Sequence, residues 1–217
     1  MDAQIDVQRS DHSKKITQRI IAFVVVIIIV ALIAVAGWQY SVYRENNHRA
    51  AASAQYEHLL KQVAANQSAA IVTAATALRN EYPKTPYATL ASLFMAKAYV
   101  QQNELPKARA ALEWALKENK TTALTGLVSV RLARVLIAEK QYQQAIELLT
   151  KAPESKQYQG MYDYVLAEAY QAKGEISQAR DYYQKAEKLL VSDATLQSIV
   201  QMKMNNLPVQ THAEVKK

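Results

Sequence analysis

Alanine and large apolar side chains recur along the second half of the chain at a regular spacing. Three stretches, 96–115, 133–152 and 167–186, align without a gap, and each has alanine at its first, thirteenth and twentieth positions. Each also has a large side chain three residues after its first alanine and another four residues after its second. The copies begin 37 and then 34 residues apart. This pattern predicts paired helices that approach closely at alanine, with the large side chains filling the space beside it.

The pattern resembles the tetratricopeptide repeat, a helix-turn-helix unit of about 34 residues that stacks on its neighbours. The resemblance assigns the packing between helices to the recurring alanines and their large neighbours. These are Ala96, Tyr99, Ala108, Leu112, Ala115, Ala133, Leu136, Ala145, Leu149, Ala152, Ala167, Tyr170, Ala179, Tyr183 and Ala186.

The copies depart from the family pattern at two sets of positions. Ser92, Ser129 and Asp163 stand where the family usually has a large residue. Only the third copy keeps glycine at the turn between its helices, at Gly174. The repeats are therefore divergent, although their packing positions are present.

Further helices are predicted on both sides of the three copies. Residues 50–66 and 68–82 predict two helices before a break at 83–86, and we interpret this pair as a degenerate first repeat. Residues 192–206 open with a Ser/Asp cap and predict one last helix, which would cover the exposed end of the stack.

A long apolar segment lies near the N-terminus. The chain carries no charge between Arg19 and Arg44, and residues 20–38 are nearly all apolar. At about 1.5 Å of rise per residue, such a helix reaches about 28 Å, close to the thickness of the hydrocarbon core of a bilayer. We therefore predict a membrane-spanning helix over residues 20–43, with Arg19, Trp38, Tyr40, Tyr43 and Arg44 at the membrane interface.

The charges beside this segment predict its orientation. Four basic residues precede it and two, Arg44 and Arg49, follow it, which favours a cytoplasmic N-terminus and a C-terminal domain outside. A cleaved signal peptide is the alternative, since Ala34-Val35-Ala36 is an acceptable cleavage site. An uncleaved anchor is favoured because the apolar run exceeds the ~7–15 residues of a signal peptide and reaches that site without a polar spacer.

The rest of the chain is predicted to be helical. The 217 residues include only four glycines and five prolines, and no segment shows the sustained alternation of a strand. The predicted fold class is all-α, with one N-terminal transmembrane helix followed by a tetratricopeptide-repeat-like α-solenoid. The predicted parts are a cytoplasmic tail (1–19), a transmembrane anchor (20–43), the repeat domain (44–208) and a disordered tail (209–217).

Few residues suggest catalytic or metal chemistry. The chain has no cysteine, and none of its four histidines is followed by a second ligand three or four residues later. It has neither a glycine-rich phosphate loop nor a serine nucleophile between glycines. The net charge of +7 comes from scattered Lys and Arg, whereas binding of nucleic acid needs a continuous basic surface. We therefore predict no enzyme activity, no metal, no cofactor and no nucleic acid partner.

Binding of another protein is the function that remains. In the tetratricopeptide family the first helix of each pair lines a groove, and the family's groove positions fall on Leu93, Lys97, Val100, Val130, Arg134, Ile137, Tyr164, Glu168 and Gln171. This mixed apolar and charged surface would hold an extended or helical segment of a partner. For each apolar member, packing against the neighbouring repeat is an equally weighted alternative. Lys97 and Arg134 resemble part of a carboxylate clamp, but the clamp's asparagines are missing, which argues against a dedicated receptor for C-termini.

The chain as a whole resembles a narrower family. A short basic tail, one N-terminal span, divergent repeats containing 87–93, 112–116 and 131–135, and a closing Met-Lys-Met-Asn-Asn-Leu-Pro at 202–208 are similar to the YfgM-type ancillary subunits of the bacterial SecYEG translocon. The resemblance implies a protein held in the inner membrane with its repeats in the periplasm. It also implies four kinds of partner: the SecYEG translocon, a PpiD-like membrane-anchored chaperone, unfolded client chains and inner-membrane lipid.

We expect such a chain to act as a tether that helps pass emerging chains to periplasmic chaperones. A single span would raise the effective concentration of its groove beside the exit pore to roughly millimolar, so weak contacts suffice. Two other functions fit the same residues. One is a scaffold for another envelope complex, in secretion or cell division, and the other is regulation through the cytoplasmic tail.

Overall fold

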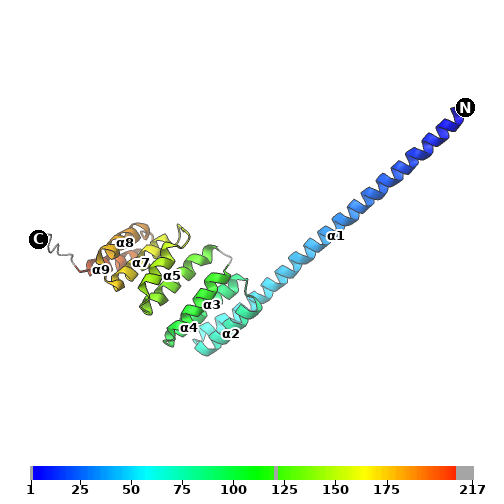
Figure 1. Ribbon diagram of the computed structural model, residues 1–217. Coiled ribbons are helices and arrows are strands. Elements are labelled where there is room, and N and C mark those ends of the chain that lie inside the picture. The colour runs from blue at the N-terminus through cyan, green and yellow to red at the C-terminus, as the bar shows by residue number, and fades with distance from the viewer. Residues whose placement is uncertain (1, 120–121, 209–217) are drawn as a thin grey trace, which may run out of the picture. The chain divides into compact units, whose positions relative to one another are not determined.

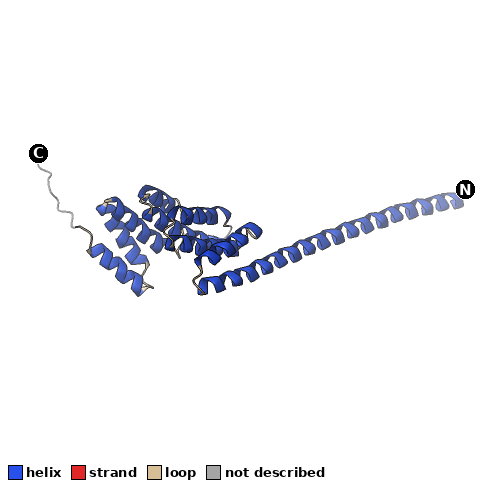
Figure 2. Ribbon diagram, turned by 90° about the horizontal axis from the view of Figure 1, so that it is seen from below, coloured by secondary structure: helices blue, strands red, loops and turns tan. Residues whose placement is uncertain are grey.

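The computed structural model describes residues 2–119 and 122–208, with side chains from residue 32 onward except that of Thr122. The regular elements within these ranges are all helices (Figure 1 and Figure 2). They are α1 (Asp2–Ala64), α2 (Ser68–Glu81), α3 (Pro86–Gln101), α4 (Leu105–Glu118), α5 (Thr122–Ala138), α6 (Tyr142–Thr150), α7 (Gln159–Lys173), α8 (Ile176–Leu189) and α9 (Ala194–Asn205). The predicted all-α class is confirmed for this part of the chain.

The chain divides into two compact units, Met1–Ala50 and Ala51–Lys217. The helix α1 contributes to both, because it continues without a break to Ala64. The prediction that a separate helix begins at residue 50 is therefore wrong, because this segment is part of α1. The physical reason is local: residues 44–64 contain no glycine or proline, so nothing in this segment interrupts a helix.

Half of the predicted membrane anchor lies outside the described side chains. Within the residues that the structure describes, no helix is long and apolar enough to cross a membrane. The predicted tail 1–19 with Arg19, residues 20–31 of the predicted span and the predicted tail 209–217 lie outside the described side chains. Trp38, Tyr40 and Tyr43, which are described, have exposed side chains. The anchor and its interface residues remain predictions.

In the second unit, helices α2 to α9 pack on one another in chain order. The helix α5 also contacts both α3 and α7, and these three are the first helices of the three predicted pairs (Figure 1). This arrangement of stacked helix pairs is an α-solenoid, in which α3, α5 and α7 form what we call the inner face.

The recurring alanines and their large neighbours lie in the core of this stack. The predicted packing residues are buried, apart from Tyr99, Ala152 and Tyr170, which are partly buried and pack against the core. Tyr183 is fully buried, and its hydroxyl donates a 2.7 Å hydrogen bond to Oε1 of Gln171. Because this bond satisfies the phenol, a tyrosine can fill a core position that leucine fills in the other copies.

The three polar residues that depart from the family pattern are also buried. Ser92, Ser129 and Asp163 are 0%, 2% and 5% exposed. The hydroxyl of Ser92 donates to the carbonyl oxygen of Ala88 at 2.9 Å, and Nε2 of Gln159 donates to Oδ1 of Asp163 at 3.3 Å. Burial raises the pKa of the Asp163 carboxyl above its ordinary value. Partners one turn earlier in the same helix therefore allow Ser92 and Asp163 to occupy apolar surroundings.

The helix pairs turn in the same way at four places. Asn66, Asn103, Lys140 and Gly174 all have positive φ angles, of 52°, 58°, 61° and 89°. In each turn the amide of this residue donates to the carbonyl three residues earlier, and the next amide donates to the carbonyl five residues earlier. This is the Schellman motif. Its presence at Asn66, 37 residues before Asn103, shows that the end of α1 and α2 share the turn of the three later pairs.

We predict opposite effects of glycine at two equivalent turns. A left-handed conformation costs a residue other than glycine about 1–2 kcal/mol. Glycine avoids this cost, but ordering its more flexible backbone on folding costs about 0.5–1 kcal/mol. Lys140→Gly should therefore raise the free energy of unfolding by about 0.5 kcal/mol, and Gly174→Ala should lower it by a similar amount. Urea unfolding followed by circular dichroism measures both. Asn103→Gly is the control and should gain less than Lys140→Gly, because asparagine tolerates this conformation. A loss of stability in Lys140→Gly would contradict the account.

Candidate functional site

An apolar pocket of about 700 Å³ opens on the inner face between α3 and α5. The helices α3 and α5 contribute most of its lining, and α1 and α4 contribute the rest. The lining consists of Tyr56, Leu90, Leu93, Phe94, Ala96, Lys97, Val100, Gln101, Leu105, Leu112, Leu127, Arg131, Arg134, Val135 and Ala138. We call this hollow the apolar pocket.

Aromatic side chains form one wall of the apolar pocket. The ring of Tyr56, in the part of α1 that belongs to the second unit, lies 5.5 Å from the ring of Tyr87 and 6.4 Å from that of Phe94, centroid to centroid. Both contacts are tilted, as aromatic pairs prefer. Tyr56 and Phe94 therefore line the pocket as packed rings, and Tyr87 supports Tyr56 from outside the lining.

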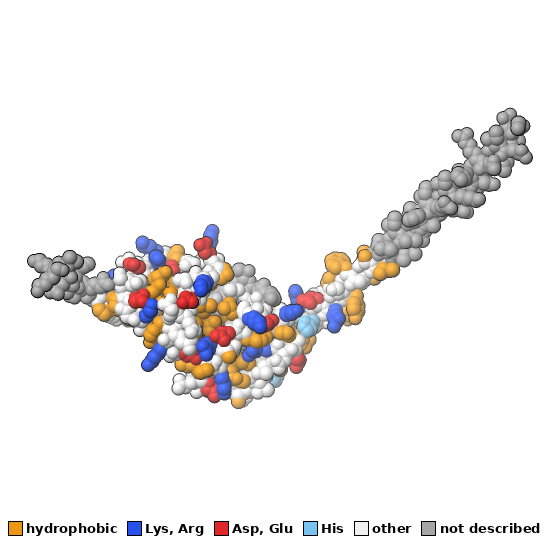
Figure 3. Space-filling view, viewed as in Figure 1, with side chains coloured by type: hydrophobic (Ala, Val, Ile, Leu, Met, Phe, Trp, Pro, Cys, Tyr) orange, Lys and Arg blue, Asp and Glu red, His pale blue; other side chains and the backbone are white. Residues whose placement is uncertain are grey.

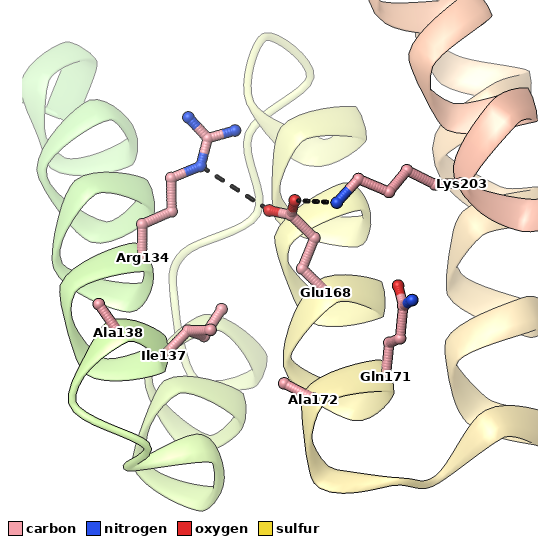
Figure 4. A pocket seen from close by; sticks show the side chains of 7 residues that line it. All are labelled: Arg134, Ile137, Ala138, Glu168, Gln171, Ala172 and Lys203. Carbon is pink, nitrogen blue, oxygen red and sulfur yellow. Dashed lines mark hydrogen bonds and ion pairs between the residues drawn. The ribbon is translucent and has the colours of Figure 1, made fainter. Parts of the chain in front are cut away.

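A second pocket of about 500 Å³ lies between α5, α7 and α9 (Figure 4). Its lining is Arg134, Ile137, Ala138, Glu168, Gln171, Ala172 and Lys203. We call it the charged pocket. Arg134 and Ala138 line both hollows, so the two pockets adjoin at α5, and together we call them the inner groove.

Glu168 organises the charged pocket. Its Oε2 lies 4.0 Å from Nε of Arg134, and its Oε1 lies 3.5 Å from Nζ of Lys203 (Figure 4). The guanidinium carbon of Arg134 also lies 5.8 Å from the ring centroid of Tyr164. Burial and then the negative charge of Glu168 raise the pKa of Tyr164 to about 12, so this phenol stays neutral at physiological pH. The acid thus connects α5, α7 and α9 across the pocket.

Seven of the predicted groove residues line one or both of these pockets. Leu93, Lys97 and Val100 line the apolar pocket, Ile137, Glu168 and Gln171 line the charged pocket, and Arg134 lines both.

The assignment of Val130 and Tyr164 to the groove is wrong. Their side chains are 3% and 5% exposed and belong to the core. Each lies one helical turn before a residue that does reach the groove, at a level where neighbouring helices cover the surface. Tyr164, for instance, packs its ring 6.1 Å from that of Tyr183 on α8. Both residues therefore pack in the core of the stack.

Several lining residues were not predicted from the sequence. Phe94, Leu127 and Arg131 share a helical face with predicted positions, so the spacing of three or four residues could have identified them. Tyr56 and Lys203 come from α1 and α9, to which the repeat pattern assigned no role in the groove. Among the residues that the structure describes, no group of His, Cys, Asp or Glu side chains is arranged to hold a metal ion.

We predict that Glu168→Gln destabilises the protein modestly and in a salt-dependent way. The change leaves Arg134 and Lys203 without their shared acid. Because these groups are partly exposed, the free energy of unfolding should fall by only about 0.5 kcal/mol, and by less in high salt. Glu147→Gln is the matched control, since Glu147 pairs with Lys151 at 3.7 Å on an exposed surface and should contribute almost nothing. Urea unfolding at low and high salt measures both. Equal effects of the two variants would contradict a special role for Glu168.

Comparison with known proteins agrees with this architecture. The ancillary SecYEG translocon subunit of Escherichia coli (strain K12) is 29% identical over 182 residues, which cover 84% of this chain and 86% of that protein. The subunit of the same name from Aggregatibacter actinomycetemcomitans is 29% identical over 185 residues, which cover 85% and 89%. These relatives confirm the resemblance seen in the sequence.

A solved structure shows the same fold. The fold of this chain matches that of Pseudomonas aeruginosa PilF with a TM-score of 0.59 at 17% identity, over 73% of this chain and 68% of that one. The family model described as a tetratricopeptide repeat-like domain matches residues 16–209. The chain therefore belongs to the tetratricopeptide repeat-like domain family.

Proposed function

We propose that this protein is an accessory subunit of the Sec translocon that binds a segment of another protein in its inner groove. The names of its curated relatives support the link to the translocon. The observation that carries the binding role is the groove itself, which is apolar over α3 and α5 and charged over α5, α7 and α9. Apolar pockets anchor a partner segment and nearby charges select its register.

The proposal includes a membrane anchor over residues 20–43. The uncharged run between Arg19 and Arg44 is long enough to span a bilayer once, and the preceding basic residues favour a cytoplasmic N-terminus. Trp38, Tyr40 and Tyr43 follow at the end of the run, where aromatic side chains suit the lipid interface. In this topology the repeats lie in the periplasm and the protein crosses the inner membrane once.

The proposed partners are the SecYEG translocon, a PpiD-like membrane-anchored chaperone and unfolded client chains. A groove tethered beside the exit pore meets these partners at an effective concentration of roughly millimolar. Individually weak contacts in the inner groove are then sufficient. The protein would pass emerging chains from the translocon to periplasmic chaperones without any chemistry of its own.

Site-specific crosslinking in intact membranes tests this function. Val100 lines the apolar pocket and is 45% exposed, so a photo-crosslinking residue there should form adducts with a translocon subunit, a chaperone or a client chain. Gln144 on α6 is the control, because it is exposed and does not line either pocket. The proposal expects adducts from position 100 of the full-length protein and few from position 144.

Two results would contradict the proposal. Equal adducts from both positions would show that the inner groove is not the binding surface. Recovery of the chain, trimmed after Ala36, from the soluble extracytoplasmic fraction would remove the anchor and with it the tether.

A further inference from the structure

Within the proposed function, we infer that the apolar pocket selects partner segments that combine apolar anchors with acidic side chains. The charged residues that line this pocket are Lys97, Arg131 and Arg134, and all three are basic. Over the face of the repeat domain seen in Figure 3, by contrast, acidic and basic side chains are interspersed. A lining of one sign beside an apolar hollow is therefore a local feature and not the general character of the surface.

Two of the three basic groups have no acidic partner in the described part of the chain. Lys97 and Arg131 are exposed and form no hydrogen bond or ion pair with any residue that the structure describes. Other basic side chains of the second unit are paired, such as Lys107 with Glu104 at 3.0 Å and Lys173 with Glu175 at 2.6 Å. The pocket therefore presents positive charge that the described residues leave uncompensated.

The placement of these charges specifies the chemistry of the occupant. Lys97 projects from α3 and Arg131 from α5, and the apolar residues Leu93 and Leu127 lie one turn before them on the same two helices. A segment with apolar side chains in the hollow therefore has basic groups on both sides of it. Carboxylates that flank the apolar anchors would meet both, whereas lysines at those places would be repelled.

The third basic residue links the apolar pocket to the charged pocket. Arg134 has Glu168 as its partner at 4.0 Å, which is a loose ion pair. A carboxylate of the occupant would share Arg134 with Glu168, while Lys203 continues to neutralise Glu168 from the other side. An acidic group at this end is thus accommodated without leaving Glu168 unpaired.

A membrane surface is the competing source of negative charge. The shape of the site favours a peptide, because these basic residues border a hollow of about 700 Å³ that a segment of chain can enter. Lipid headgroups form a broad surface, which is met by basic residues on an exposed helix face and not inside a groove.

A pair of synthetic peptides tests the inference on the full-length protein in detergent micelles. Both peptides have about 15 residues and the same leucines on one helical face, with either glutamate or lysine at the remaining positions. Fluorescence anisotropy should show the acidic peptide binding about tenfold more tightly than the basic one in about 50 mM salt, with the difference shrinking in about 500 mM salt.

Charge reversal at the pocket supplies the decisive comparison. The double variant Lys97→Glu with Arg131→Glu should lose the preference for the acidic peptide. The matched control is Lys117→Glu with Lys156→Glu, which makes the same change in net charge at exposed residues outside the apolar pocket and should keep the preference. Circular dichroism of both variants checks that the helices are intact.

Three results would overturn the inference. They are equal affinity for the two peptides, no saturable binding of the acidic peptide, and equal loss in both double variants. A pocket variant that no longer binds phosphatidylglycerol vesicles but still binds the acidic peptide would show that the basic residues bind lipid instead.

Crosslinked adducts from position 100, together with equal affinities for the two peptides, would support the proposed function and contradict only its preference for acidic segments. Absence of adducts would remove the function itself.

Discussion

Close contact between helices at buried alanines is the constraint on which the rest of this structure depends. Ala133 on α5 and Ala167 on α7 are fully buried, and α5 packs on both α3 and α7. Because alanine has only a methyl group, neighbouring helices can approach closely there, and larger side chains such as Leu136 fill the adjacent space. The turns with positive φ are alike in each pair, so the second helix of each pair follows the first in the same way. The alignment of α3, α5 and α7 along one face follows from these two features.

The inner groove is a consequence of that alignment. Val100, Ile137 and Gln171, each four residues after a buried alanine, line two adjoining pockets of different character. The apolar pocket carries basic groups at its edge, whereas in the charged pocket Glu168 is paired with Arg134 and Lys203. The stack therefore presents both apolar area and selective charge, which suits recognition of another chain.

Most of the stack could be predicted from the sequence, because its packing depends on residue size at a fixed period. The alanines and the turn at Gly174 identify helix pairs by themselves. The continuation of α1 to Ala64 was not predicted, because the end of the uncharged run at Arg44 marks the end of the predicted anchor but does not break the helix. Val130 and Tyr164 were misplaced because periodicity alone does not tell how far neighbouring helices cover a face. The contribution of Lys203 depends on where α9 docks, which the repeat pattern does not encode.

The most direct test of the account compares two alanine-to-leucine substitutions on α5. Ala133 is fully buried at the helix contacts, whereas Ala138 is exposed and lines the inner groove. The measurement is the free energy of unfolding in urea. The account predicts that Ala133→Leu loses about 1–3 kcal/mol through overpacking, while Ala138→Leu changes stability by less than about 0.5 kcal/mol. Equal effects of the two substitutions, or a stable Ala133→Leu variant, would contradict the claim that buried alanines set the spacing of the helices.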